Sequence, residues 1–166
     1  MRIIIFLLAI ITVTILFGCK SSNTGAVEIS NHTQSVEGEA EILHSWNGDY
    51  PVVQLHLLPE NQREQAVGFI SDAKIFESLW KAFKPGEEVP EIDFEANLVL
   101  FACNTQFYNR ISIGKVNLKD GVAEVLAMET MSAIPIEDKV GMSLVMVSRT
   151  GIKSVRTPYG LVSIYD

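Results

Sequence analysis

Cysteine is scarce in this chain, in which Cys19 and Cys103 are the only two. A single pair cannot build a disulfide-rich scaffold, and a zinc ribbon needs two separate cysteine pairs. Both classes of small domain are therefore excluded. Because Cys19 lies at the end of an apolar leader, we expect no disulfide within the domain that follows it.

Positive charge is also limited. The chain has 13 Lys and Arg against 20 Asp and Glu, which gives a formal net charge of −7. A surface with this excess of negative charge repels phosphate backbones, so we expect no nucleic-acid partner. Hydrophobic residues make up 48% of the chain, a composition typical of folded domains.

Sequence signatures of common catalytic centres are missing. The chain has no Gly-Xaa-Ser-Xaa-Gly elbow, no glycine-rich phosphate loop and no His-Glu-Xaa-Xaa-His pair. We therefore expect a protein that is not an enzyme and has no catalytic residue, metal or cofactor. A hydrolase whose carboxylates have no recognisable spacing is an alternative hypothesis.

An apolar run of residues 3–17 follows Arg2 and ends in the motif Leu16-Phe17-Gly18-Cys19. As a helix the run spans roughly 22 Å, short of the roughly 30 Å hydrocarbon core, which favours a signal peptide over a permanent membrane span. The motif resembles a bacterial lipobox. The resemblance implies that residues 1–18 are cleaved off between Gly18 and Cys19 and that Cys19 carries the lipid. An ordinary secretory signal or an uncleaved anchor is the alternative.

The lipid expected on Cys19 and the residue after it indicate the cellular location of the protein. Two or three acyl chains hold a protein stably on a membrane. We therefore predict a bacterial cell-envelope protein that contacts the membrane through its N-terminal lipid. Lys20, in place of an acidic residue, favours the outer over the inner membrane in a Gram-negative cell. Residues 19–38 form the lipidated end and a polar, flexible tether, and residues 39–166 form one globular domain.

Strand-like patterns dominate this domain. Residues 40–46 and 52–58 flank Asn47-Gly48-Asp49 and predict a hairpin. Residues 98–103 form an uninterrupted apolar run, which predicts a central strand buried on both faces. The apolar phase slips at Gly114-Lys115, which predicts a bulge, and Lys119-Asp120-Gly121 predicts a second hairpin turn.

One segment has helical periodicity. Ile75, Leu79 and Phe83 recur at every fourth position, after a candidate cap at Ser71 or Asp72. The sequence therefore predicts an α+β fold. It is β-rich, with a mainly antiparallel sheet or sandwich and one packed helix at about residues 71–83, in which Trp80 faces the sheet.

The order of several segments between residues 70 and 155 resembles the C-terminal domain of the PrcB-like protease-complex accessory family. The segments are Phe76-Glu77-Ser78-Leu79-Trp80, Ile92-Asp93-Phe94, Leu98-Val99-Leu100-Phe101-Ala102 and Arg110-Ile111-Ser112-Ile113. Members of this family are small exported proteins or lipoproteins. The resemblance implies that the partner is an exported protease complex that this protein stabilises.

The loop of residues 104–110 is the candidate partner-binding surface. It follows the most buried predicted strand and concentrates polar and aromatic side chains on a rigid base. The candidate residues are Asn104, Gln106, Phe107, Tyr108 and Arg110. We therefore expect a non-enzymatic envelope lipoprotein that binds or stabilises a protein partner.

A small-ligand or metal-binding lipoprotein is the alternative function. His44 and His56 fall on adjacent predicted strands, with Glu39 or Glu41 as a third ligand. Soft-metal binding would instead use thioethers, although methionines that alternate with Leu and Val are typical of a sheet core. These methionines are Met128, Met131, Met142 and Met146. Cys103 ends the buried strand and is expected to be a core residue.

Replacing Cys19 by Ala should abolish both lipid attachment and signal cleavage, because the lipoprotein peptidase acts only on a lipidated precursor. Metabolic labelling with radioactive palmitate, followed by gel electrophoresis, measures both effects at once. The variant should be unlabelled and retain the precursor's mass. A wild-type chain that incorporates no label would show that the leader is not a lipoprotein signal.

Overall fold

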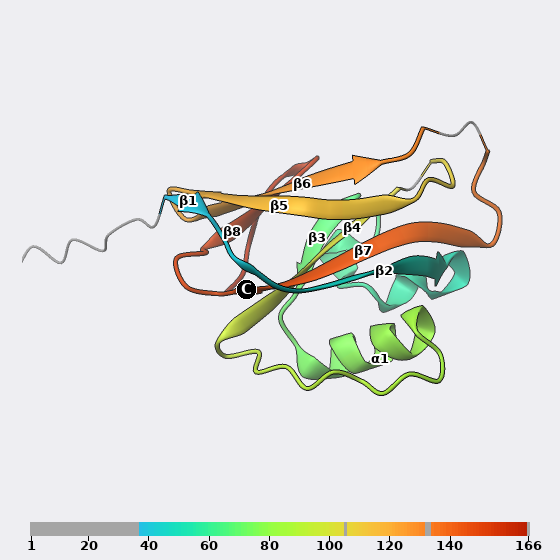
Figure 1. The fold of residues 1–166 in the computed structure, drawn as a ribbon, viewed down its shortest axis with the longest axis horizontal. Helices are drawn as coiled ribbons and strands as arrows, with labels where there is room; N and C mark the ends of the chain where they lie inside the picture. Colours follow the sequence, from blue (N-terminus) through green and yellow to red (C-terminus); the bar gives the residue numbers. More distant parts are fainter. Residues whose placement is uncertain (1–36, 105, 132–133, 166) are drawn as a thin grey trace, which may run out of the picture. The chain divides into compact units, whose positions relative to one another are not determined.

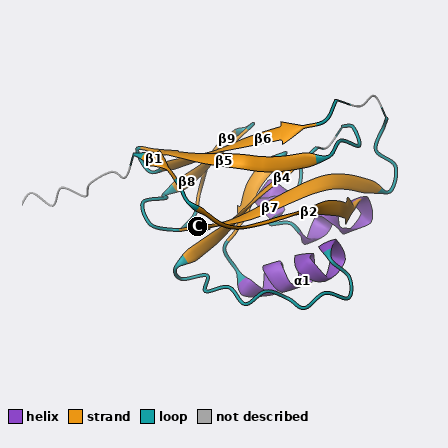
Figure 2. Ribbon diagram, in the orientation of Figure 1, coloured by secondary structure: helices purple, strands orange, loops and turns teal. Residues whose placement is uncertain are grey.

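The computed structural model describes residues 37–104, 106–131 and 134–165, which belong to a compact unit, Thr33–Asp166. Within these residues the chain forms two β-sheets and one α-helix (Figures 1 and 2). The predicted β-rich α+β fold is therefore confirmed. The predicted signal peptide, Gly18, Cys19 and the tether up to residue 36 lie outside the described residues.

The first sheet has four antiparallel strands in the order β2-β7-β4-β3. Its strands are β2 (Ile42–Pro51), β3 (Val67–Ile70), β4 (Asn97–Cys103) and β7 (Lys139–Ser148). The second sheet has the order β1-β5-β6-β8-β9, and only its β6–β8 pair is parallel. Its strands are β1 (Gly38–Glu39), β5 (Ile111–Lys119), β6 (Val122–Glu129), β8 (Ser154–Thr157) and β9 (Gly160–Ser163).

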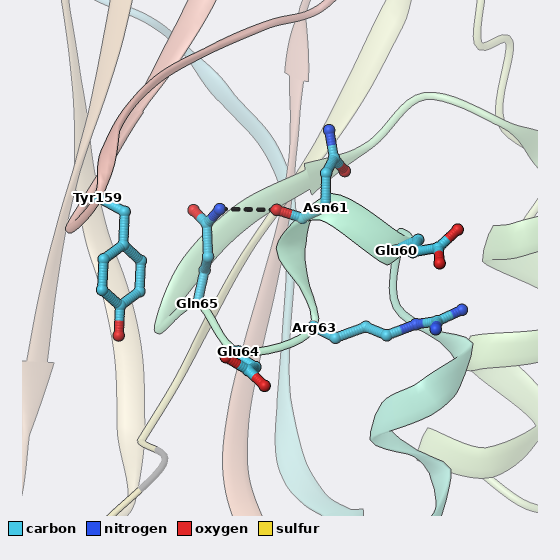
Figure 3. Close-up of a pocket in the computed structure, with 6 residues that line it drawn as sticks. All are labelled: Glu60, Asn61, Arg63, Glu64, Gln65 and Tyr159. Atoms are coloured by element: carbon cyan, nitrogen blue, oxygen red, sulfur yellow. Dashed lines mark hydrogen bonds between the residues drawn. The ribbon is translucent and has the colours of Figure 1, made fainter.

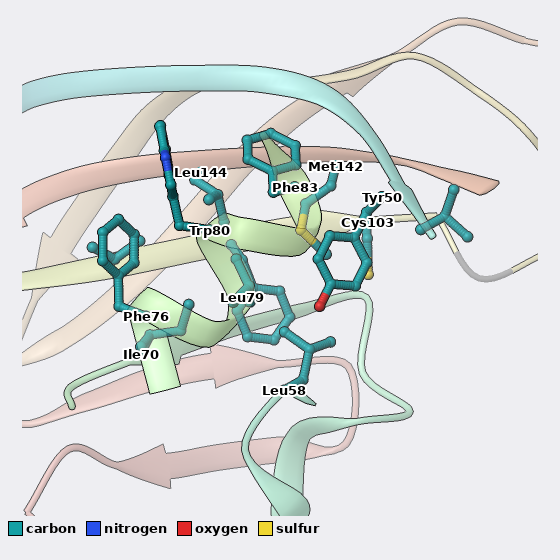
Figure 4. Packing of buried hydrophobic residues seen from close by; sticks show 13 residues of the cluster. Tyr50, Leu58, Ile70, Phe76, Leu79, Trp80, Phe83, Cys103, Met142 and Leu144 are labelled. Carbon is teal, nitrogen blue, oxygen red and sulfur yellow. The ribbon is translucent and has the colours of Figure 1, made fainter. Parts of the chain in front are cut away.

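The four-stranded sheet is the middle of three layers, with the helix on one face and the five-stranded sheet on the other (Figure 1). Successive residues of β4 point to opposite faces and are buried on both. Val99, Phe101 and Cys103 belong to the cluster that contains the helix residues. Figure 4 shows this cluster, with Cys103 labelled. Leu98, Leu100 and Ala102 pack against the second sheet. The continuous apolar run therefore forms an interior strand, as the sequence predicts.

Helix α1 (Ala73–Phe83) covers the first face. Asp72 is its N-cap, and one carboxylate oxygen accepts hydrogen bonds from the backbone N–H groups of Lys74 and Ile75, both at 2.9 Å. The buried side chains of the helix are Phe76, Leu79, Trp80 and Phe83. The predicted helix is confirmed, and its core-facing stripe is confirmed at Leu79 and Phe83, whereas Ile75 is only partly buried.

No helix among the described residues is long and apolar enough to cross a membrane.

The predicted hairpin around Asn47-Gly48-Asp49 is wrong. Strand β2 runs straight through these residues and pairs with β7 as far as Pro51. The segment after it is a 3-10 helix, η1 (Val52–Leu57), rather than a strand. Gly48 serves another purpose, because a Cβ there would lie 3.2 Å from ring atom Cε2 of Phe83. The glycine lets α1 pack closely on β2.

Two other local predictions are confirmed. The pairing of β5 with β6 shifts register between Ile113 and Lys115, which is the bulge expected at Gly114. The β5–β6 turn places Asp120 and Gly121 at φ values of 54° and 83°. Positive φ at both central residues is the geometry that short hairpin turns require.

Replacing Trp80 by Ala should lower the free energy of unfolding by about 3–5 kcal/mol. Trp80 is 2% exposed and meets the rings of Trp46 and Phe83 edge-on, at centroid distances of 5.4 and 6.1 Å. Chemical denaturation of the 33–166 domain measures the change. Lys81→Ala is the control on the same helix; its exposed ion pair with Glu77 should contribute at most about 0.5 kcal/mol. Equal midpoints for both variants would contradict the assigned core.

Candidate functional site

The loop of residues 104–110 connects the end of β4 to the start of β5, and Asn104 shapes its first turn. Its side-chain oxygen accepts hydrogen bonds from the backbone N–H groups of Gln106 and Phe107, both at 2.8 Å. Its amide nitrogen donates to Glu129 at 2.6 Å. Such a side-chain turn fixes the backbone, so Asn104 acts as a structural residue of the loop.

Tyr108 joins the middle of the loop to strand β2 of the four-stranded sheet. Its hydroxyl donates a 2.8 Å hydrogen bond to a carboxylate oxygen of Asp49 on β2, and its backbone N–H donates to the Ile134 carbonyl at 3.0 Å. The hydrogen bond to Asp49 raises the pKa of Tyr108, with smaller contributions from desolvation and from the Asp49 charge. The hydroxyl therefore stays protonated at neutral pH and acts as a donor.

The far end of the loop continues the β5–β6 ladder. The backbone N–H of Arg110 donates to the Thr130 hydroxyl at 3.0 Å, and the Thr130 N–H donates to the Arg110 carbonyl at 2.9 Å. Gln106 and Arg110 have exposed side chains, and Phe107 is 41% exposed although its backbone bridges to Pro135. The structure thus divides the predicted site into an anchored part, Asn104 and Tyr108, and a solvent-facing part.

Two surface hollows flank the Tyr108–Asp49 pair, and Asp49 lines both of them. One hollow, of about 320 Å³, extends toward Glu137 and Asp138. The other, of about 240 Å³, extends toward Arg110. Their linings combine carboxylates with a guanidinium and exposed backbone. Such groups can bind polar side chains of a partner, but they do not form a nucleophile–base pair.

Sequence reasoning missed two residues of this site. Asp49 was assigned to a turn, and nothing local marks it as the acceptor of a tyrosine 59 residues away. Gly141 on β7 was also unrecognised. A Cβ at this position would collide with the backbone carbonyl oxygen of Asn109, so glycine is required for the loop to lie against β7. An isolated glycine within a strand is the one available signal of such a contact.

The histidine pair proposed for a metal does not lie on adjacent strands. His44 is on β2 and stacks on Trp46 at a centroid distance of 5.7 Å. His56 is on η1, with its Nδ1 2.8 Å from the Val53 carbonyl oxygen. Glu39 pairs with Lys115 at 3.0 Å. No three His, Cys, Asp or Glu side chains among the described residues are grouped to hold a metal ion.

The methionines and Cys103 occupy different surroundings. Met142 is buried on β7, whereas Met128 is 71% exposed and Met131 is fully exposed. A sheet-core assignment is therefore wrong for Met128 and Met131, because the end of the β5–β6 hairpin has no layer over it among the described residues.

Cys103 is buried as expected. Burial raises the pKa of its thiol to about 12, which keeps it protonated and a poor nucleophile at neutral pH.

A larger hollow, of about 520 Å³, lies between the segment before β3 and the β8–β9 turn (Figure 3). Glu60, Glu64 and Arg63 line it with exposed side chains, and Tyr159 closes one side. The amide nitrogen of Gln65 donates to the Asn61 carbonyl at 2.8 Å. The side chains that line this hollow are charged, amide or phenolic, whereas small-ligand pockets are lined predominantly by hydrophobic side chains.

The chain matches no protein-family model, no curated protein and no solved structure.

Replacing Gly141 by Ala should destabilise the 33–166 domain by about 1–3 kcal/mol, because the added methyl group must displace the backbone of the loop at Asn109. Gly114→Ala is the matched control, since a Cβ there meets only the Met128 methyl group at 3.6 Å. Thermal unfolding gives both stabilities. If the two variants unfold at the same temperature, Gly141 does not position the loop.

Proposed function

We propose that this chain is a lipid-anchored bacterial envelope protein that binds a partner protein through the exposed face of the loop of residues 104–110 and catalyses no reaction. The observation that carries the proposal is the state of Phe107. This large apolar ring is 41% exposed although the backbone on both sides of it is held by hydrogen bonds. An exposed aromatic ring on a fixed backbone has the character of a binding anchor.

Fixing the loop favours binding. Association costs free energy for every side chain and loop that must be ordered at an interface. Here the Asn104 turn and the Tyr108–Asp49 hydrogen bond fix the backbone before a partner arrives. Aromatic residues and Arg are enriched at protein interfaces, and both Phe107 and Arg110 face solvent.

The identity of the partner follows from the leader and from the family resemblance. A lipid on Cys19 would hold the domain at the membrane, beside other exported proteins. The resemblance to the PrcB-like accessory family favours a protease complex as the partner, with this chain stabilising the assembled complex. In this role the fold supplies a rigid support for the loop.

Phe107→Ser should weaken partner capture from detergent-solubilised membranes by about 30-fold or more, the equivalent of about 2 kcal/mol. Tyr159→Ser is the matched control, because Tyr159 is 78% exposed and lies at a different turn. Co-purified proteins are quantified by mass spectrometry, and thermal midpoints are measured on the same samples. Unchanged capture by Phe107→Ser, or equal losses in both variants, would refute the proposed role of the loop.

A further inference from the structure

One edge of strand β6 is left without a strand partner over most of its length. Val122 and Ala123 pair with Ser154 and Val155 of β8, and β8 then turns into β9. Past Ala123, residues 124–129 pair with β5 only, and the described chain places no strand on their other side. In Figure 1 the arrow of β6 continues to the right past β8.

Three other strand edges in the described chain each have a backbone group that is hydrogen-bonded to a side chain. On β3, the backbone N–H of Phe69 donates to the buried Gln62 side-chain oxygen at 2.6 Å. On β5, the N–H of Ile113 donates to the Ser143 hydroxyl at 3.0 Å. Near the end of β2, Lys84 donates to the Asn47 carbonyl at 3.0 Å. For residues 124–129 of β6, by contrast, the described chain provides neither a strand nor a side-chain hydrogen bond on the open edge.

The side chains on this edge do not discourage pairing. Proteins usually protect an open edge with Lys or Pro, and residues 122–131 contain neither. Instead Leu126 and Met128 lie on the outer face of the sheet, 43% and 71% exposed. Met128 extends over Gly114, which has no side chain. An apolar strip beside open backbone groups is the arrangement that β-strand addition uses.

We propose that the edge of β6 at residues 124–129 binds an extended segment of the partner protein as an added antiparallel strand. The main chain of the segment would pair with the open backbone groups, and its apolar side chains would lie beside Leu126 and Met128. This inference rests on the proposed function and specifies how the partner is recognised. The edge is continuous with the loop site, because Glu129 and Thr130 are hydrogen-bonded to Asn104 and Arg110.

The charges at the two ends of the edge specify the segment further. Glu129 accepts a hydrogen bond from the neutral Asn104 amide and forms no ion pair within the part of the chain that the structure describes. The Glu124 carboxylate oxygen lies 3.6 Å from Nε of Arg156, and both side chains are 54% exposed. Arg156 therefore neutralises the charge of Glu124 only weakly. Opposite charges placed directly across a strand pair are favourable. The partner segment therefore carries Lys or Arg at both ends and apolar residues at alternate positions between them.

In one register the same charges disfavour a second copy of this chain as the occupant. An antiparallel β6–β6 pair centred between Leu126 and Ala127 would set Glu124 of one copy against Glu129 of the other, at both ends of the pair. Like charges directly opposite each other destabilise a sheet. The net charge of −7 on each chain adds to the repulsion. A cationic segment meets neither penalty.

The test uses the full-length chain in detergent micelles and a fluorescein-labelled peptide, Lys-Val-Thr-Val-Thr-Lys. Read against β6 in the antiparallel direction, its lysines lie opposite Glu129 and Glu124 and its valines opposite Met128 and Leu126. Fluorescence anisotropy measures binding, and amide hydrogen exchange followed by mass spectrometry locates it. We expect exchange to slow at least 10-fold within residues 124–129. Protection elsewhere, or no binding at millimolar peptide, overturns the proposal.

Three comparisons test the chemistry of the binding. The peptide Glu-Val-Thr-Val-Thr-Glu should bind at least 10-fold more weakly. Only alternate amides of an added strand face its neighbour. We therefore compare two N-methylated peptides, one methylated at both valines and the other at both threonines. One of the two should lose binding, and the other should retain it. Met128→Lys should weaken binding about 10-fold, whereas Leu161→Lys, on an exposed apolar residue of β9, should change it less than 2-fold. Equal effects in any of these pairs contradict strand addition.

Two further measurements separate this inference from the proposed function. If Met128→Lys dissociates a dimer of the full-length chain in sedimentation, a second copy fills the edge and the proposal is wrong. If Phe107→Ser abolishes capture of the membrane partner and Met128→Lys does not, the loop binds the partner and the edge does not. If both variants capture normally, the proposed function itself fails, whatever the peptide does.

Discussion

The burial of β4 and β7 on both faces is the constraint on which the rest of this structure depends. Their apolar residues alternate between two clusters, so neither face of the four-stranded sheet can be exposed to water without a large cost. One face is covered by α1 and the other by the five-stranded sheet. The three layers follow from this requirement, and the loop of residues 104–110 starts at the end of a strand that is buried on both faces.

Features set by neighbouring residues were predictable from the sequence. The Asp72 cap, the apolar stripe of α1 and the bulge at Gly114 each depend on a few adjacent positions. Asn47-Gly48 carries an equally strong local signal for a turn, yet it lies within a strand. The decisive contact there is with Phe83, which is distant in sequence. Local propensity is overridden where packing between layers fixes the backbone.

The same distinction separates the predictable and unpredictable parts of the site. An aromatic, polar loop after a buried strand could be recognised from residues 104–110 alone. Its supports could not be, because Tyr108 is held by Asp49 on β2 and the Asn109 backbone lies against Gly141 on β7. Both contacts form only after three strands have been assembled. The sequence therefore indicates which residues of the loop are exposed better than it indicates which residues hold the loop in place.

The open edge of β6 follows from how the second sheet is closed. Strand β8 pairs with only two residues of β6 before it turns into β9, whose last residues lead to the buried Ile164 beside β8. Val155 and Ile164 are buried between the sheets at this end of the sandwich. At the other end, the described chain places no strand beside residues 124–129 of β6. That open edge lies next to the loop of residues 104–110, because Glu129 is hydrogen-bonded to Asn104. Main-chain pairing groups and an exposed aromatic ring therefore lie at the same end of the domain.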